Sequence, residues 1–298
     1  MADSQMSGLL TEMAQSSLAR LEQARAKESE QVLWTRVCAA PTAPKLKLSA
    51  EGFDIIAECK LASPSAGDLS QHTTDIDRRV QAYAHGGACA VSVLTEPTRF
   101  GGSLEHLEQI AQTLAPLGVP VMRKDFLVDP YQVMEARAAG AGGVLVIVRM
   151  LDRSRIKALL DVAAMLKMFV LIEAFDAADL QVAQEVLTER KAHDEQMLVG
   201  VNCRDLDTLS VDLSRLGQLA SFLPPNFASV AESGVGSLED VKTVVDVGYD
   251  VALVGTTLMN SDDPGKLLGE MLATGRERAM AVRTRKMRIG TGASIGDE

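Results

Sequence analysis

"FDIIAECKLASPSAG", residues 53–67, is the stretch that most directly predicts the fold. Its first five residues, 53–57, are mainly apolar and predict the start of a buried β-strand. Glu58 and Lys60 follow two positions apart, and side chains alternate along a strand, so both charged groups point to the same side. A carboxylate and an ammonium at the end of an otherwise core-like strand indicate a site at that end.

The rest of the chain repeats this pattern, because strand-like apolar runs alternate with helix-like segments. The runs are 53–60, 89–95, 119–124, 143–149, 169–175, 198–203, 228–232 and 251–257. Strands that are apolar on both faces, each followed by a helix, indicate a parallel sheet, and eight such units predict a closed barrel. An open doubly wound sheet is the alternative, but the Gly-rich fingerprint expected after its first strand is missing.

The predicted fold is therefore α/β, a single (β/α)8 TIM barrel with an N-terminal helical extension. Residues 1–48 are expected to form the extension and to pack on the barrel, with one or two helices within 5–36. Residues 49–275 are expected to form the catalytic barrel. Residues 276–298 are expected to hold the end of the last helix and a tail that is disordered from residue 290.

The composition excludes several classes of function. The chain has 298 residues and a net charge of −10, which argues against nucleic acid as a partner, since phosphate backbones require clustered cations. It contains neither a signal-peptide pattern nor an apolar stretch of about 18 residues, so no membrane span is expected and a cytoplasmic location is predicted. Four scattered cysteines without a CxxC pair predict reduced thiols and no metal site.

Acids, bases and amides occur at the carboxyl ends of the predicted strands, where barrels of this kind carry their chemistry. In chain order they are Glu58, Lys60, Lys124, Glu173, Asn202, Arg204, Glu232 and Ser233. Three glutamates and two lysines inside apolar strands each require desolvation, and a barrel built for stability alone would use Val or Leu. The set therefore indicates a catalytic site in which neighbouring groups shift each other's pKa.

The ends of the last two strands predict a phosphate site. Gly234, Gly255 and Thr256 offer backbone amides beside glycine and are followed by helix starts, which is the usual phosphate cradle of this fold. Ser63, shortly after the first strand, adds a hydroxyl donor. A small phosphorylated molecule is the ligand that these residues predict.

These segments resemble those of the indole-3-glycerol phosphate synthase family, barrel enzymes of tryptophan biosynthesis. The resemblance covers about residues 50–272, and its most specific segments are "AECKLASPSAGDL" (57–69), "SVLTEPTRFGGSLEHL" (92–107), "MRKDFLVDPYQVMEARAAGAGGVLVI" (122–147), "GVNCRDLDTLSVDL" (200–213), "ESGV" (232–235) and "LVGTTLM" (253–259). The chain departs from the family pattern at Leu61, where Lys or Arg is usual, and at Arg149.

The resemblance implies a carboxy-lyase that needs neither a metal nor an organic cofactor. Its substrate would be 1-(2-carboxyphenylamino)-1-deoxy-D-ribulose 5-phosphate, which closes a ring and loses CO2 and water to give indole-3-glycerol phosphate. Lys124 would be the general acid of ring closure. Lys60 and Glu173 would serve dehydration, with Glu58 holding Lys60 or sharing its proton transfer.

The resemblance also implies residues that bind the substrate. Asn202, Glu232 and Ser233 would orient it, and Arg204 would clamp the surrounding loops. The phosphate would be held by Ser63, Gly234, Gly255 and Thr256. Phe100 and Leu127 would flank the aromatic ring.

Other functions were weighed against the same residues. Phosphoribosylanthranilate isomerase would require a Cys base ending the first strand and an Asp acid on the sixth, but Cys59 points away from Glu58 and the sixth strand carries Asn202. A non-catalytic barrel that partners another pathway enzyme would be indicated by a lost catalytic residue, and none is lost. A paralogue acting on a modified anthranilate stays open. The expected assembly is a monomer or weak homo-oligomer, with contact to other tryptophan-pathway enzymes as a further option.

Overall fold

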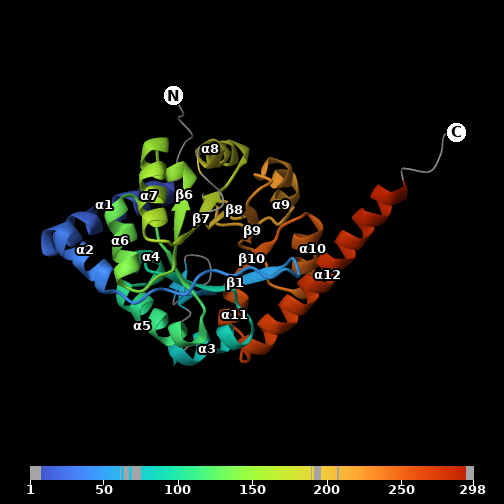
Figure 1. Ribbon diagram of the computed structural model, residues 1–298, viewed down its shortest axis with the longest axis horizontal. Helices are drawn as coiled ribbons and strands as arrows, with labels where there is room; N and C mark the ends of the chain where they lie inside the picture. The colour runs from blue at the N-terminus through green and yellow to red at the C-terminus, as the bar shows by residue number, and fades with distance from the viewer. Residues whose placement is uncertain are drawn as a thin grey trace.

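The computed structural model describes residues 8–60, 62–63, 67–68, 75–188, 190, 196–206 and 208–292, and for 62–63, 67–68 and 285–292 it describes the backbone alone. Within these residues eight parallel strands close into a barrel in the order β1-β10-β9-β8-β7-β6-β5-β4 (Figure 1). The strands are β1 (Asp54–Cys59), β4 (Ala90–Leu94), β5 (Val121–Lys124), β6 (Gly143–Ile147), β7 (Phe169–Ala174), β8 (Met197–Asn202), β9 (Ala228–Glu232) and β10 (Val251–Val254). Each strand overlaps its predicted range, and the predicted (β/α)8 barrel is confirmed.

Helices surround the strands in the described part of the chain. They are α3 (Ile76–His85), α5 (Leu104–Leu114), α6 (Pro130–Ala138), α7 (Arg153–Met165), α8 (Ala177–Thr188), α9 (Ser214–Leu219), α10 (Leu238–Asp246) and α12 (Pro264–Gly292), with short α4 (Pro97–Phe100) and α11 (Thr256–Met259) and the 3-10 turns η2 (Ala115–Leu117), η3 (Val148–Met150) and η4 (Ala220–Phe222). Side-chain caps explain several starts, such as Asp152 accepting from the Arg155 amide at 2.8 Å. No helix in these ranges combines the length and apolarity needed to cross a bilayer.

The alternation of side chains along the strands divides the apolar residues into two layers. Ile55 and Ala57 of β1 belong to the core between strands and helices. Ile56, between them, packs inside the barrel with residues such as Leu145 and Leu171. Alternate residues of each strand therefore pack either against the helices or inside the barrel. The last inward-pointing residues lie at the barrel mouth, at the carboxyl ends of the strands.

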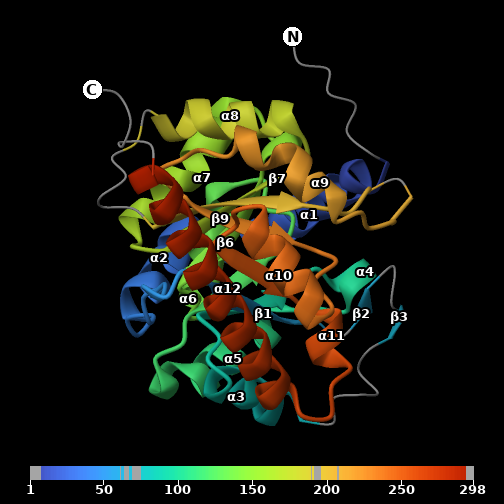
Figure 2. The same cartoon turned by 90° about the vertical axis from the view of Figure 1, so that its right-hand side faces the viewer.

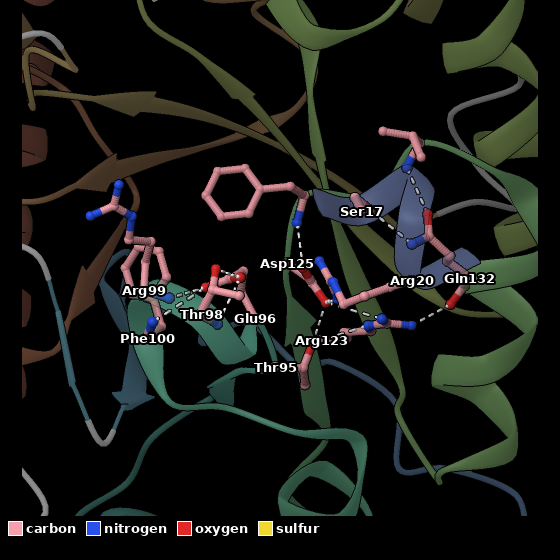
Figure 3. A network of polar contacts seen from close by, with 12 residues as sticks. Ser17, Arg20, Thr95, Glu96, Thr98, Arg99, Phe100, Arg123, Asp125 and Gln132 are labelled. Atoms are coloured by element: carbon pink, nitrogen blue, oxygen red, sulfur yellow. Dashed lines mark hydrogen bonds and ion pairs between the residues drawn. The ribbon is translucent and has the colours of Figure 1, made fainter. Parts of the chain in front are cut away.

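The N-terminal extension folds as two helices, α1 (Gly8–Lys27) and α2 (Glu30–Ala39), in agreement with the predicted one or two. Arg20 of α1 forms a two-pronged ion pair with Asp125 just after β5, at 2.8 and 2.9 Å (Figure 3). Asp125 also accepts from Arg123 at 3.0 Å and from the Thr95 hydroxyl at 2.7 Å. These partners outweigh the effect of burial and hold the pKa of Asp125 far below its usual range.

Further polar contacts tie the extension to helix α6. The Tyr131 hydroxyl donates to the Glu28 carbonyl at 2.9 Å, and the Gln132 amide donates to the buried Ser17 hydroxyl at 2.9 Å. Leu33 and Val37 of α2 pack in the apolar cluster that contains Tyr131. The extension is therefore joined to the barrel on the same side as the end of β5, and α1 contributes to the wall of the barrel mouth.

The last helix, α12, is longer than the sequence pattern predicted. It continues to Gly292, so residues 290–292 are helical instead of belonging to the predicted disordered tail, while 293–298 lie outside the described residues. No Pro or Gly occurs in 276–289, so nothing in that stretch ends the helix. Figure 2 shows α12 crossing the outside of the barrel, and a side chain at Gly275 would collide with the Phe53 ring beneath it. A two-stranded antiparallel ribbon, β2 (Ala62–Ser63) with β3 (Gly67–Asp68), follows β1.

Replacing Asp125 with asparagine should destabilise the protein, because Arg123 and Arg20 would lose a buried partner. The expected loss is about 3 kcal/mol at pH 7, measured by urea unfolding. The folded pKa of Asp125 is depressed, so its stabilisation is present above the ordinary pKa of about 3.8 and is lost as pH falls further. The gap between wild type and Asp125→Asn should therefore narrow below pH 4.

The matched control for this variant is Asp246→Asn. Asp246 forms a comparable two-pronged pair with Arg278, but on the surface, and its removal should cost less than about 1 kcal/mol. Equal losses for the two variants would show that the buried pair does not anchor α1.

Candidate active site

Four strand ends bring five charged side chains together at the mouth of the barrel. The Lys124 ammonium at the end of β5 lies 3.0 Å from Glu232 of β9, 3.3 Å from Glu173 of β7 and 4.0 Å from Glu58 of β1. Lys60 pairs with the other oxygen of Glu58 at 2.7 Å. The sequence predicted all five as site residues, and the structure places them in one cluster.

Burial makes the electrostatics of this cluster strong. The Lys124 side chain is 15% exposed and that of Glu232 only 1%. Burial alone would raise the pKa of the Glu58 carboxyl, but Lys60 and Lys124 outweigh it and hold that pKa below its ordinary value. Burial would likewise lower the pKa of Lys124, but Glu232, Glu173 and Glu58 raise it, so the ammonium stays charged.

Glu232 behaves in the opposite way to Glu58. Burial is the largest influence on it, and together with the nearby Glu173 carboxylate it outweighs Lys124 and raises the pKa of Glu232 to about 8. Within the part of the chain that the structure describes, its Oε1 atom is buried without a hydrogen-bond partner. A carboxyl with a pKa raised to about 8 is poised to hold and release a proton near neutral pH.

Two glycines give the carboxylates room. A side chain at Gly200 of β8 would collide with Glu232 Oε1, and one at Gly255 would collide with Glu58 Oε1 and lie 3.0 Å from the Lys60 ammonium. The sequence predicted Gly255 as a phosphate ligand alone. The structure adds a second reason for glycine there, because any larger residue would push the Glu58–Lys60 pair out of place.

Asn202 and Ser233 meet beside the cluster. The Ser233 hydroxyl donates to Asn202 Oδ1 at 2.9 Å, and the same oxygen accepts from the Arg204 amide at 3.0 Å. Ser233 has a φ of +68°, an unfavourable backbone for a non-glycine residue that is often found at functional sites. The Arg204 guanidinium donates to the Leu209 carbonyl at 2.7 Å, so it braces the loop after β8.

A rim of backbone amides lies across the mouth from β5 and β6. Gly234, Gly255 and Thr256 all line the cavity, and their amides donate no hydrogen bond within the described residues. The amides of Gly236 and Ser237, by contrast, already donate to Asp240 at the start of α10. The first three amides are therefore available to an anion. The predicted fourth ligand, Ser63, has only its backbone described, in β2.

An apolar wall forms the opposite part of the cavity, whose volume is about 440 Å³. Phe100 belongs to it as predicted, with its ring centroid 6.1 Å from that of Phe126. Leu145, Ile147, Phe175 and Leu206 complete the wall near the strands, and Leu9 and Leu10 of α1 also line the cavity.

Leu127, predicted to flank the ring, does not line the cavity. Its side chain is buried in the layer between strands and helices. The alternation along β5 carries the signal that was missed: positions 122, 124 and 126 share the inward side, whereas 127 has the opposite parity. The same rule connects Glu173 with Phe175.

Glu96 is a further residue that the sequence reasoning missed. It is buried, and its carboxylate accepts from the amides of Thr98 at 2.9 Å, Arg99 at 2.7 Å and Phe100 at 3.3 Å (Figure 3). These bonds fix the short helix α4 and with it the position of Phe100. The motif around residue 96 was noted, but a capping role requires knowing that α4 exists.

The site was also examined for side chains that could bind a metal ion. Among the described residues, no group of three or more His, Cys, Asp or Glu side chains is placed to hold a metal ion. The arrangement instead offers a charged lysine, a carboxyl with a pKa near neutrality and two further carboxylates within a few ångströms, which is equipment for proton transfer.

Buried acids and bases at the carboxyl ends of a closed parallel barrel, between an apolar wall and a rim of amides, are the arrangement of a (β/α)8 enzyme with its site at the barrel mouth. The family model described as indole-3-glycerol phosphate synthase matches residues 10–271. The chain belongs to the indole-3-glycerol phosphate synthase family.

Individual relatives agree with this assignment. The indole-3-glycerol phosphate synthase of Mycobacterium ulcerans (strain Agy99) is 40% identical over 244 residues, which cover 80% of this chain and 85% of that protein. The protein of the same name from Leptospira interrogans is 39% identical over 216 residues, covering 72% of this chain and 81% of that protein.

Solved structures also resemble the barrel. Thiamine phosphate pyrophosphorylase from Pyrococcus furiosus has a TM-score of 0.55 at 13% identity, covering 76% of this chain and 97% of that chain. 3-Hexulose-6-phosphate synthase from Salmonella typhimurium has a TM-score of 0.55 at 15% identity, covering 76% and 100%. At these identities the likeness concerns the fold alone.

The raised pKa of Glu232 predicts an unusual dependence of stability on pH. Between the ordinary pKa of about 4.5 and about 8, the folded protein holds a proton on this carboxyl that the unfolded chain has released. Its contribution is therefore present at low pH and is lost as pH rises through that window. Glu232→Gln should remove up to about 1.4 kcal/mol per pH unit of this downward slope, measured by urea unfolding from pH 5 to pH 8.5.

Glu239→Gln is the control, since Glu239 is exposed on α10 and forms a surface ion pair with Lys242. Its unfolding curve should follow wild type across the same range. If Glu232→Gln also kept the wild-type slope, Glu232 would be an ordinary ionised carboxylate.

Proposed function

We propose that the protein converts 1-(2-carboxyphenylamino)-1-deoxy-D-ribulose 5-phosphate into indole-3-glycerol phosphate, CO2 and water. The observation that carries the proposal is the position of Lys124, a charged ammonium among three carboxyls between an apolar wall and free amides. The aromatic ring would lie on the wall, the phosphate on the amides of Gly234, Gly255 and Thr256, and the reacting carbons between them beside Lys124.

Ring closure requires an acid at the ketone of the substrate. When the ring carbon that bears the carboxylate attacks this carbonyl, negative charge develops on its oxygen and a proton must be supplied. Lys124 is charged, faces into the mouth and has carboxyls beside it that can return a proton. It is the general acid of this step.

The substrate carboxylate needs a cation until CO2 leaves. Among the residues whose side chains the structure describes, Lys60 pairs with one carboxylate, Glu58 at 2.7 Å, and it lines the same cavity as Lys124. Lys60 therefore holds the carboxylate before decarboxylation. Loss of CO2 returns the electron pair to the ring, which becomes aromatic again.

Dehydration needs an acid for the departing hydroxyl and a base for the proton that is lost. Lys60 protonates the hydroxyl, while Glu58 keeps Lys60 in position. Glu173, 3.3 Å from Lys124, takes the proton, and Glu232 with its raised pKa passes protons between Glu173 and Lys124. Asn202 and Ser233 orient the sugar hydroxyls through the polar groups that face the cavity.

The alternative functions receive less support. Cys59, the base that an isomerase would need, is buried in the outer layer, and burial raises the pKa of its thiol to about 12. The end of β8 carries Asn202 where that enzyme would have an acid. A non-catalytic barrel would have no use for Glu232, whose burial beside Glu173 costs free energy that a neutral residue would avoid.

The proposal includes a location and an assembly. The four cysteines are free thiols, which suits a cytoplasmic protein of tryptophan biosynthesis. Exposed large apolar residues such as Met165, Phe222 and Met280 lie on different elements, which suits a monomer or a weak homo-oligomer. Contact with other enzymes of the pathway would use surfaces outside the barrel mouth.

Substituting the proposed acids and base should abolish most activity while leaving the fold intact. Lys124→Arg, Lys60→Met and Glu173→Gln should each lower kcat by about 10²-fold or more, measured as indole-3-glycerol phosphate formation in single turnovers. Lys124→Arg is preferred to a neutral residue because it keeps a cation among the carboxyls, yet a guanidinium does not release its proton.

Thermal melts of the same variants separate catalysis from stability. Lys242→Met, a surface lysine paired with Glu239, is the control and should retain wild-type turnover. A Glu173→Gln variant that melts early but turns over normally would assign Glu173 a structural role.

The amide rim predicts inhibition by inorganic phosphate that is competitive with the substrate.

Gly234 has a φ of +83°, and a Cβ there would lie 2.6 Å from Val211 Cγ1, so Gly234→Ala should displace the amide. KM should rise about tenfold, with a smaller effect on kcat. Gly118→Ala, at a φ of +71° in open space, carries similar backbone strain far from the rim. An equal rise in KM for both variants would count against this phosphate site.

A further inference from the structure

Arg149 is one of the two residues at which the sequence departs from the family pattern, and the structure shows what it contacts. β6 pairs with β7 so that Ile147 lies opposite Glu173, and Arg149 therefore follows at the level of Phe175. The Arg149 guanidinium stacks on the Phe175 ring, with 4.6 Å between its central carbon and the ring centroid. This is a cation–π contact at the edge of the barrel mouth.

The guanidinium is held on the ring by two carboxylates of the next segment. Arg149 Nη2 lies 2.6 Å from Asp176 and 2.7 Å from Asp179, and Nε donates to Asp179 at 2.9 Å. Asp179 Oδ2 also accepts from the Phe175 amide at 2.8 Å. A planar, two-pronged arginine is thus fixed to the backbone of the residue whose ring it covers.

Phe175 is clamped from a second direction as well. Its carbonyl accepts from the Arg215 guanidinium of α9. The backbone donor and acceptor of Phe175 are both engaged, and one face of its ring is covered by Arg149. The remaining surface of the ring faces the cavity beside Ile147 and Leu145, which places it in the apolar wall.

A ring fixed in this way sets the size of the space beside it. An unclamped aliphatic side chain can change rotamer to admit a larger ligand, whereas the Phe175 ring can turn only if it leaves the Arg149 guanidinium, and its backbone is fixed by Asp179 and Arg215. A pocket wall that is held in place disfavours an added methyl group by about 10- to 200-fold.

We propose that Phe175 is the specificity-determining residue for the aromatic end of the substrate and that Arg149 is the positioning residue that holds it. The inference rests on the proposed function and deepens it: the wall formed by Phe175 admits the unsubstituted carboxyphenylamino ring and excludes ring-substituted analogues. The inference predicts the opposite of a paralogue that prefers a modified anthranilate, and the experiment below distinguishes the two.

The test compares the parent substrate with its four ring-methyl analogues, one for each ring position that the reaction does not use. The variants are Phe175→Leu, Arg149→Leu and, as a control, Arg153→Leu, which removes an arginine paired with Glu185 on the surface of α7. The measured quantity is the ratio of kcat/KM for the parent to that for each analogue. Dissociation constants of the same five compounds with the ketone reduced to an alcohol, which cannot react, are measured by calorimetry.

Wild type and Arg153→Leu should disfavour at least one methyl position by about tenfold or more. Phe175→Leu should reduce that discrimination about tenfold, and Arg149→Leu should reduce it about threefold at the same position. For the parent substrate, Arg149→Leu should act mainly on KM. A purely structural role for Arg149 would lower the melting temperature and leave the methyl ratios unchanged.

The outcomes separate this inference from the proposed function. Suppose that the parent compound is bound or turned over normally and that the parent-to-analogue ratios are the same in wild type and all three variants; this result would overturn the inference alone. A wild-type enzyme that prefers a methylated analogue to the parent would do the same. Binding that shows the predicted ratios without turnover would support the wall and contradict the proposed function. No binding of the reduced parent compound to wild type would overturn both.

Discussion

One ammonium buried among three carboxyls is the constraint on which the rest of the site depends. Lys124 lies within 4.0 Å of Glu58, Glu173 and Glu232, and Lys60 supplies the second cation of the group. Three ionised carboxylates with two cations would leave an uncompensated negative charge in a desolvated place, which is costly. Protonation of Glu232 relieves it. The cluster is thus neutral when it holds one shared proton, and that proton is what the chemistry requires.

The barrel brings these charged groups together through the alternation of side chains along its strands. Alternate side chains of each strand point into the barrel, and the last of them lie at its mouth. This alternation places Lys124, Glu173 and Glu232 close together, and two residues further along it places Phe126 and Phe175 on the same inward side. Glycines at positions 200 and 255 remove the side chains that would occupy the space of the carboxylates. Helix α1 adds an anchor next to Lys124, because the Arg20–Asp125 pair fixes the chain immediately after it.

The sequence was sufficient for the barrel and for the charged cluster because both follow from local patterns. Apolar runs with polar ends identified the strands, and two-residue spacing placed Glu58 and Lys60 on one side. The sequence was insufficient for residues whose role depends on contacts with distant parts of the chain. Leu127 was predicted from the family resemblance, although the alternation of side chains along β5 favours Phe126. Arg149 was recognised as unusual, but its stacking on Phe175 could not be predicted from the sequence. Arg20 pairs with Asp125, which is far from it in sequence. Glu96 caps the short helix α4, which no sequence pattern predicted.

The claim that the cluster holds one proton at neutral pH is tested most directly by carbon-13 NMR of protein labelled at its glutamate side-chain carboxyls. The spectrum of the wild-type enzyme at pH 7 should contain one carboxyl resonance at the position of a protonated acid, which titrates near pH 8 and is missing in Glu232→Gln. A spectrum in which every glutamate carboxyl is fully ionised at pH 7, with no titration between pH 6 and pH 9, would contradict the account.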